Sequence, residues 1–418
     1  MGGSSTIKGG RCSPGGYHPI QLGHHLHGRY RIVSKLGYGG YSTMWLARDV
    51  QQSKYVAVKV GVAISDEKEV GILEQLTSPA ESKGKPGGKS MILPILDRFT
   101  VSGPNGTHPC FVTTPAQCCL TDAREASHSG LFQLDVARSL AAQLAIAVAY
   151  VHSKGYVHGD LHLKNILLES ASGLDDLSDK QLDEKLGPPH PQPVHRQDGK
   201  SLTSGVPSHV FWPAWLGRPS DQISLSDAKL ILCDFGVAFC PEKESRFESY
   251  TLLQSRPPEA RFDPETPLSF ASDIWSLGCA IWAILGIKQF LSGWLFSEDD
   301  ATGDQVDALG PLPPEWWEKW ERRHVQFMEN GQPKENREPW SWDQRFEDCI
   351  QRPRREYGME ALDEKEKDAF FQMVRSMLSF RPEDRPSARQ VLNASWMKNW
   401  AIPAYEKSRE RERRADRT

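Results

Sequence analysis

The sequence predicts an α+β protein with two lobes, a small β-rich N-lobe followed by a large, mainly helical C-lobe. Three observations lead to this prediction. The chain has 418 residues, which is long for one compact core. Its first hundred-odd residues contain short alternating apolar segments typical of strands, and apolar residues at helical spacing dominate beyond residue 119.

The composition places the chain in an ordinary class of globular proteins. It is 39% hydrophobic and 25% charged, and its formal net charge of -4 gives no overall attraction to nucleic acid or membranes. Eight cysteines without a CxxC pair indicate reduced thiols, so we expect a protein of the cytoplasm or nucleus. We also expect the protein to be a monomer. Gly2 and Thr6 fit the N-myristoylation pattern, which small-residue N-termini often match by chance.

The N-lobe is expected over residues 30–118, after a flexible leader at 1–29 that is rich in Gly, Ser and His. Val70, Leu73 and Leu76 recur at helical spacing and predict one helix among the strands. The predicted strands are 30–33, 45–48, 55–60, 91–100 and 110–114, and the predicted helix is 66–76.

The C-lobe is expected over residues 119–400. Leu140, Leu144 and Val148 form one stripe of a long apolar helix. The predicted helices are 131–153, 273–287 and 364–378, with a strand at 229–233. Two segments without clear periodicity are expected to be insertions, and the chain ends in a charged tail. These segments are about 170–227, about 311–360 and 401–418.

A glycine-rich hairpin is predicted between the first two strands. Gly37, Gly39 and Gly40 would let the backbone approach phosphate oxygens closely, although such a turn is more often purely structural. The strand that follows argues against a dinucleotide-binding fold, where a similar motif leads into a helix.

Lys59 lies 22 positions after Gly37 within an apolar strand. It could simply extend from a sheet edge to solvent, or it could hold the phosphates of a nucleotide. The second role requires a carboxylate. Glu69 is the best-placed candidate, and Glu67 and Glu74 are alternatives.

Asp160 and Asn165 have the spacing used in phosphoryl transfer, where a carboxylate lies near the acceptor hydroxyl and an amide binds a metal ion. Asp234 follows a predicted strand and would chelate Mg²⁺. Each motif alone is weak. Their combination in this order, with Lys59 and Glu69, predicts an ATP-dependent phosphotransferase.

From about residue 30 to residue 400 the chain resembles the eukaryotic protein kinases. Pro257-Pro258-Glu259 resembles their APE motif, and residues 272–278 match the DxWSxG stretch whose Asp273 would brace the catalytic loop. Arg385 stands where an Arg is expected to pair with Glu259. The resemblance implies the bilobal protein-kinase fold, ATP and Mg²⁺ as cofactors, and a protein substrate rather than nucleic acid or a membrane.

The resemblance also implies roles for individual residues. Catalysis would involve Asp160, Lys59, Asn165 and His162, and the metal ligands would be Asn165 and Asp234. The residues expected to contact the nucleotide are Leu36, Gly37, Tyr38, Gly39, Gly40, Met44, Ala57, Lys59, Glu69, Thr114 and Ala116.

Within the kinases, the chain is most similar to the SR-protein kinases. Residues 36–46 look like their LGxGxFSTVWL motif, and 170–227 occupies the slot of their spacer. That family phosphorylates serine in Arg/Ser-rich splicing factors. The acidic stretch 298–304, with carboxylates at 298, 299, 300 and 304, could dock such basic substrates, although an acidic loop is more often only a solvated surface. The alternatives are a pseudokinase that binds nucleotide or a partner, and, less favoured, a small-molecule phosphotransferase.

Three positions depart from the kinase pattern. Gly159 replaces the Arg that would pair with a phosphorylated activation segment, so activity without phosphorylation of that segment is expected. His162 stands where most protein kinases have a Lys, and it could donate a hydrogen bond instead. Leu252 stands where a Thr usually contacts the catalytic Asp, with Thr251 one place away.

Overall fold

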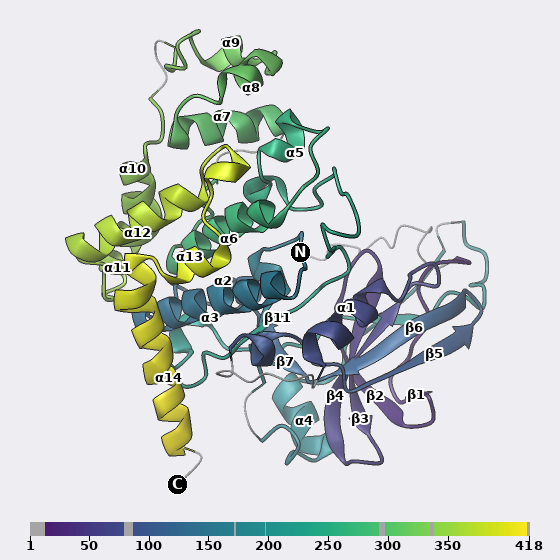
Figure 1. Ribbon diagram of the computed structural model, residues 1–418. Coiled ribbons are helices and arrows are strands. Elements are labelled where there is room, and N and C mark those ends of the chain that lie inside the picture. The colour runs from purple at the N-terminus through teal and green to yellow at the C-terminus, as the bar shows by residue number, and fades with distance from the viewer. Residues whose placement is uncertain are drawn as a thin grey trace. The chain divides into compact units, whose positions relative to one another are not determined.

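A computed structural model describes residues 13–78, 87–170, 173–196, 198–291, 297–334 and 338–415. The chain forms two compact units (Figure 1). Unit 1 contains residues up to 78 together with 93–117 and 169–217, and unit 2 contains the rest. The seven cysteines in the described ranges form no disulfide.

Unit 1 is built on one antiparallel sheet whose strands lie in the order β1-β2-β3-β4-β6-β5. The strands are β1 His25–Leu26, β2 Tyr30–Tyr38, β3 Ser42–Asp49, β4 Lys54–Gly61, β5 Asp97–Gly103 and β6 Gly106–Thr113. One helix, α1 (Lys68–Thr77), follows β4, and β7 (Ala116–Cys119) continues the chain toward unit 2. The predicted strand at 91–100 begins later than expected because residues 89–91 form a single 3₁₀ turn.

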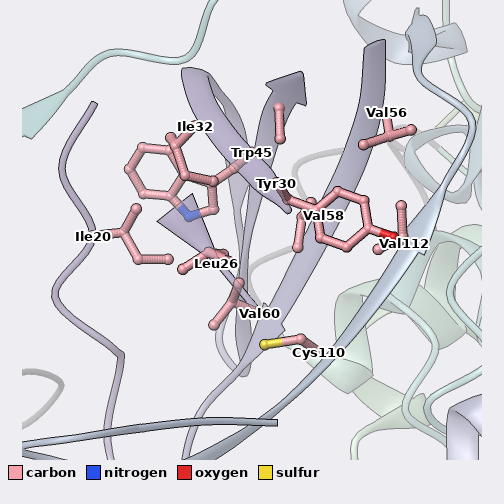
Figure 2. Packing of buried hydrophobic residues seen from close by; sticks show 11 residues of the cluster. Ile20, Leu26, Tyr30, Ile32, Trp45, Val56, Val58, Val60, Cys110 and Val112 are labelled. Atoms are coloured by element: carbon pink, nitrogen blue, oxygen red, sulfur yellow. The ribbon is translucent and has the colours of Figure 1, made fainter. Parts of the chain in front are cut away.

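The alternation of β4 separates the two faces of this sheet. Val56, Val58 and Val60 point to one face, where they pack with Trp45 and other buried side chains (Figure 2). Tyr55 belongs to a separate cluster with Leu46 on neighbouring β3. Since successive side chains alternate, Lys59 lies on the same face as Tyr55.

The segment 169–217 packs on unit 1 and contains a helix, α4 (Asp179–Leu186), that the sequence did not predict. Leu182 is fully buried against Leu46 and Tyr55. Asp179 accepts hydrogen bonds from Tyr55 Oη at 3.1 Å and from Arg31 Nη2 at 2.5 Å. This part of the spacer is therefore built into the β-rich unit, whereas the sequence led us to expect an insertion of the C-lobe.

Residues 13–28 were expected to belong to a flexible leader. Their apolar side chains instead pack on the face of the sheet that carries Val56, Val58 and Val60. Ile20 is only 3% exposed and packs with Leu26 against the Trp45 ring (Figure 2). This packing could not be predicted, because only a few apolar residues are scattered among Gly and His in this segment. Burial, reinforced by the imidazoles of His108 and His24, lowers the pKa of His18 in this segment to about 4.

Unit 2 is helical around two long buried helices, α3 (Leu134–Ser153) and α6 (Phe270–Leu285). Both were predicted, with ends shifted by a few residues. By length and composition α3 could span a membrane, but 78% of its apolar window is buried, as expected for a core helix. The other helices are α2 Leu120–Glu125, α5 Glu259–Phe262, α7 Glu298–Leu309, α8 Pro314–Lys319, α9 Arg323–Gln326, α10 Trp342–Phe346, α11 Arg352–Glu356, α12 Glu364–Met377, α13 Ala388–Leu392 and α14 Ile402–Ala415.

The charged tail expected at 401–418 is helix α14 over its described part, and it lies beside α3 (Figure 1). Lys407 forms an ion pair with Asp135 at 2.6 Å, and Ser408 Oγ donates to the Leu225 carbonyl at 2.6 Å. These contacts join the end of the chain to the core of unit 2.

The Trp-rich insertion forms a small core of its own. Trp316, Trp317, Trp320 and Phe327 are buried together with Phe262 of α5. They form a satellite core, because their clustering removes most of their apolar area from water.

Candidate functional site

The glycine-rich hairpin and Lys59 are neighbours in the sheet of unit 1. Met44 on β3 pairs with Gly37 on β2 and with Lys59 on β4. Three residues that are distant in sequence therefore share one row across three strands. This register places the lysine beside the predicted phosphate-binding hairpin.

Lys59 is fixed by a carboxylate on α1. Its ammonium nitrogen lies 2.8 and 2.7 Å from the two carboxylate oxygens of Glu69, and both side chains are largely buried. Of the alternatives, Glu74 contacts Arg98 at 3.3 Å, and Glu67 occupies the N-cap position of α1. An ammonium held in this way is positioned to contact phosphate oxygens.

The fold itself does not require the glycines of the hairpin. Gly37, Gly39 and Gly40 have no positive φ, and a Cβ built on each would meet no described atom within 4 Å. Neither backbone conformation nor packing among the described atoms accounts for these glycines, and the approach of phosphate oxygens stays a prediction.

The other predicted nucleotide contacts also lie in unit 1. Ala57 on β4 pairs with Leu46 on one side and Thr113 on the other. The remaining predicted contacts are Leu36 and Tyr38 on β2, Thr114 directly after β6, and Ala116 at the start of β7.

In unit 2 the catalytic-loop residues surround the carboxylate of Asp160. The Nδ2 atom of Asn165 donates to the Asp160 backbone carbonyl at 2.9 Å and to its Oδ2 at 3.2 Å. The other carboxylate oxygen, Oδ1, is buried and has no hydrogen-bond partner in the described part of the chain. A buried, unpaired oxygen can accept a proton or a hydrogen bond from a bound hydroxyl.

His162 contributes to the same cluster. Its Nδ1 accepts from the backbone N–H of Lys164 at 3.2 Å. Nε2 lies 3.3 Å from Asp160 Oδ2 and 3.3 Å from the Nδ2 atom of Asn165. The imidazole thus lies beside the carboxylate and the amide, and a hydrogen bond from it in place of the usual lysine stays a prediction.

Asp234 lies next to Asn165 because two strands bring them together. Strand β11 (Leu230–Leu232) pairs with β8 (Ile166–Glu169), and the Cys233 N–H extends the ladder to the Asn165 carbonyl at 3.0 Å. Asp234 itself has φ of 63°, which is uncommon for a non-glycine residue and is found often at functional sites.

The backbone of the catalytic loop is held by a buried carboxylate on α6. Asp273, 1% exposed, accepts from the N–H groups of His158 at 2.7 Å and Gly159 at 2.9 Å, and from His152 Nε2 at 2.9 Å. Burial alone would raise the pKa of Asp273, but these hydrogen bonds outweigh it and lower the pKa below its ordinary value. The carboxylate therefore stays charged and keeps the loop in place.

Thr251, and not Leu252, faces the catalytic loop. Thr251 is 3% exposed and its hydroxyl donates to the Gly159 carbonyl at 3.1 Å. Leu252 is 50% exposed. The residue one position before Leu252 therefore supplies a hydroxyl to the loop, and this hydroxyl bonds the Gly159 carbonyl rather than the Asp160 carboxylate.

Gly159 is required by the backbone. Its φ is +79°, and a Cβ there would lie 3.2 Å from the Val237 carbonyl. A side chain as large as Arg would be strained at this position. The absence of the usual Arg is therefore part of how this loop is built.

The activation segment, residues 237–256, is held by its own contacts. Arg246 donates to the Val237 carbonyl, contacts Glu244 at 2.8 Å, and stacks over the Phe239 ring. Behind the segment, Arg385 forms a buried ion pair with Glu259, with nitrogen–oxygen distances of 2.8 and 2.6 Å.

The acidic stretch at 298–304 is engaged within unit 2. It belongs to helix α7, where Asp299 contacts Arg261 at 2.6 Å and Asp304 contacts the buried Arg345 at 2.5 Å. The sequence suggested that it docks basic substrates. Three of its four carboxylates are paired with arginines of the same unit, since Glu298 also contacts Arg256 at 2.9 Å. Docking by this stretch stays a prediction.

The profile of the protein kinase domain matches residues 30–179 and 222–397. This chain belongs to the protein kinase family. The kinase is 26% identical over 399 residues to a serine/threonine protein kinase of Aspergillus fumigatus, covering 91% of this chain and 87% of the relative. It is also 26% identical over 396 residues to the serine/threonine-protein kinase SRPK of Physarum polycephalum, covering 92% and 89%.

A shorter match covers part of the kinase. Protein kinase dsk1 of Schizosaccharomyces pombe is 36% identical over 159 residues, or 37% of this chain and 29% of the relative. A crystal structure of a kinase domain superposes with a TM-score of 0.60 at 18% identity, covering 91% of this chain and 98% of that one. The chain is a serine/threonine protein kinase with the protein-kinase fold, as the sequence predicted.

The residues of unit 2 fit a magnesium ion that binds together with nucleotide phosphates. Asn165 commits Nδ2 to the loop, and its Oδ1 is the hard oxygen donor that Mg²⁺ prefers. The described residues contain no group of three or more His, Cys, Asp or Glu arranged to hold a metal. Two protein oxygens, from Asn165 and Asp234, suit an ion that keeps water and phosphate ligands.

Proposed function

We propose that this kinase transfers the γ-phosphate of ATP, bound as its magnesium complex, to serine in Arg/Ser-rich proteins of the cytoplasm or nucleus. Asp160 is the proposed base. The observation that carries this role is the asymmetry of its carboxylate. Oδ2 accepts from Asn165 Nδ2 and lies 3.3 Å from His162 Nε2, while Oδ1 is buried and has no hydrogen-bond partner among the described residues.

The proposed step is a direct transfer. The serine hydroxyl oxygen bonds to the γ-phosphorus as the bond to the bridging β–γ oxygen breaks, and the hydroxyl proton passes to Asp160. Lys59, held by Glu69, would contact the nucleotide phosphates, and Asn165 and Asp234 would hold the metal. Mg²⁺ supplies charge neutralisation at the phosphates when it is bound.

The substrate class rests on relatives and on charge. The Physarum polycephalum relative, named SRPK, aligns along 92% of this chain. Because Asp299 and Asp304 are engaged by arginines, a basic substrate would need other carboxylates. Glu242 and Glu248 of the activation segment are exposed. Arg246 and Arg256 of the same segment form ion pairs with Glu244 and Glu298 of this chain.

We also propose that the kinase is active without phosphorylation of its activation segment. Arg246 and Thr251 hold the segment through contacts made by unmodified side chains. At Gly159 the loop has no guanidinium that a phosphate would engage. Phosphatase-treated protein, checked for unmodified mass, should keep full activity.

The experiment that tests the substrate proposal compares two peptides of equal length and charge, an Arg-Ser repeat and a Lys-Ser repeat. A planar guanidinium forms bidentate contacts with carboxylates that a lysine cannot form, so kcat/KM should favour the Arg-Ser peptide. The double variant Glu242→Gln/Glu248→Gln should raise KM for that peptide. Equal kcat/KM for both peptides would contradict the proposed substrate class and leave the kinase activity standing.

A further inference from the structure

The hydroxyl group of Tyr17 holds the glycine-rich hairpin. Tyr17 Oη donates to the carbonyl oxygen of Gly39 and lies 3.3 Å from that of Gly40. The tyrosine belongs to the segment 13–22, named here the N-terminal strap, which precedes the sheet. The role predicted for the hairpin, binding of phosphate oxygens by its backbone, does not by itself require a residue from the strap.

The hairpin tip has few other contacts that fix it. Gly39 N–H bonds to the Ser42 carbonyl at 2.9 Å, and the Tyr41 carbonyl accepts from Val62 N–H at 2.9 Å. The side chains of Tyr38 and Tyr41 are exposed. Glycines are conformationally free, so each hydrogen bond at this tip restricts the range of backbone conformations that it samples.

The geometry of the peptide bond turns this contact into an arrangement of donors. In a trans peptide the C=O and the following N–H point in opposite directions. A Gly39 carbonyl directed at Tyr17 therefore turns the Gly40 N–H away from the strap, and the Gly40 carbonyl does the same for the Tyr41 N–H. Within the described residues neither N–H has an acceptor, and such donors bind phosphate oxygens.

The strap is itself firmly attached. Gly15 N–H donates to the Asn105 carbonyl at 2.8 Å, and Asn105 Nδ2 donates back to the Tyr17 carbonyl at 2.6 Å. Ala63 N–H donates to the Gly16 carbonyl at 3.1 Å. Ile20, three residues after Tyr17, is buried in the core of unit 1 (Figure 2).

Asn105 also connects the strap to the spacer. Its Nδ2 donates to the Gly205 carbonyl at 2.8 Å, and the Asn105 side chain is buried. A Cβ on Gly205 would lie 2.1 Å from Asn105 Oδ1, so only glycine permits this approach. One amide therefore contacts the spacer and the strap together, and the strap contacts the hairpin.

We propose that Tyr17 is a positioning residue for ATP, and that Asn105 makes the position of the hairpin depend on the spacer. The inference rests on the proposed role of the hairpin in binding ATP. Segment 203–216 of the spacer thus acts on nucleotide affinity from a distance. A partner that displaces it would weaken ATP binding without touching the hairpin.

The test removes single atoms and measures steady-state kinetics with Mg·ATP. Tyr17→Phe deletes only the hydroxyl, and Tyr357→Phe, an exposed tyrosine of unit 2, is the matched control. A hydrogen bond of ordinary net strength corresponds to about a threefold to tenfold rise in KM for ATP. We expect this rise for Tyr17→Phe, with kcat and KM for the peptide within about twofold of wild type and an unchanged thermal midpoint.

Asn105→Ala tests the connection through the strap. It should raise KM for ATP to a similar extent, and the double variant Tyr17→Phe/Asn105→Ala should be no worse than the larger single effect, since both act on one path. Gly205→Ala approaches the same amide from the spacer side, where its Cβ would meet Asn105 Oδ1, and it should act in the same direction.

Two outcomes would overturn the inference: an unchanged KM for ATP in Tyr17→Phe, or equal losses in kcat and thermal stability, which a merely structural role would produce. Direct titration of the wild type with Mg·ATP distinguishes failure of the Tyr17 inference from failure of the proposed function. Binding of ATP without Arg-Ser preference removes the substrate proposal and leaves the Tyr17 comparison valid. Absence of ATP binding removes both.

Discussion

The contact between Thr251 and the Gly159 carbonyl gives a sharp test of how the catalytic loop is supported. Thr251→Val keeps the shape of the buried side chain and removes the hydroxyl that donates at 3.1 Å. The variant loses the hydrogen bond and leaves a carbonyl without that donor, at a cost of about 1–2 kcal/mol. The peptide bond of that carbonyl leads directly into Asp160, so we expect this cost to fall on the position of the base.

If the lost hydrogen bond raises the free energy of the transition state by this amount, kcat falls by about 5- to 30-fold. The assay is the initial rate of transfer of radiolabelled phosphate from Mg·ATP to an Arg-Ser peptide. Thr251→Ser retains a hydroxyl and should recover most of the rate. Leu252→Thr should not raise it, since Leu252 is half exposed. A wild-type rate in Thr251→Val, or a gain in Leu252→Thr, would refute the assignment.

Three further predictions concern stability. Arg385→Met leaves the buried Glu259 carboxylate unpaired and should lower the free energy of unfolding by about 3–5 kcal/mol in urea titrations, and a loss below 1 kcal/mol would show that the pair is unimportant. Leu182→Ala should cost about 2–4 kcal/mol if the spacer is part of unit 1, whereas a spacer that is only loosely attached would show no change. His18 has a pKa lowered to about 4 in the folded state against 6.5 unfolded, so the unfolded state binds more protons in this range and stability should fall as pH drops from 6.5 to 4. His18→Gln should flatten that dependence, and an equal slope in both proteins would contradict the burial of this imidazole.

The sequence identified the candidate residues of the site because their motifs are local and ordered. Lys59, Asp160 and Asp234 each sit in a short segment whose strand or loop context could be recognised without knowledge of the fold. Their partners from distant parts of the chain could be predicted only where one candidate residue was better placed than the others. Glu69 was chosen by its place on the helix, and its contact with Lys59 is present in the structure.

The sequence could not predict contacts that depend on distant partners. Helix α4 has only Leu182 and Leu186 as apolar residues, and their burial depends on strands more than a hundred positions earlier. A capping box formed by Ser178 and Gln181 was the one local signal for this helix. The neutralisation of Asp304 by Arg345 was equally hidden, because the two residues lie 41 positions apart.

The difference of one position at Thr251 has another cause. An alignment to a family motif assigns each residue by its number of positions from the motif. In an irregular segment, however, the side chain that faces the loop can be the one a single position earlier, without any change in the length of the segment. The exposure of the two side chains decides between them, and it requires the folded chain.

Asp160 is the proposed base of a working phosphotransferase, and phosphate transfer tests this role most directly. The decisive measurement is transfer of radiolabelled phosphate from Mg·ATP to an Arg-Ser peptide by the wild type, Asp160→Asn and Lys59→Met. We predict transfer by the wild type and loss of turnover in both variants, with unchanged thermal midpoints. A wild-type rate in Asp160→Asn, or nucleotide binding without any transfer by the wild type, would contradict the account.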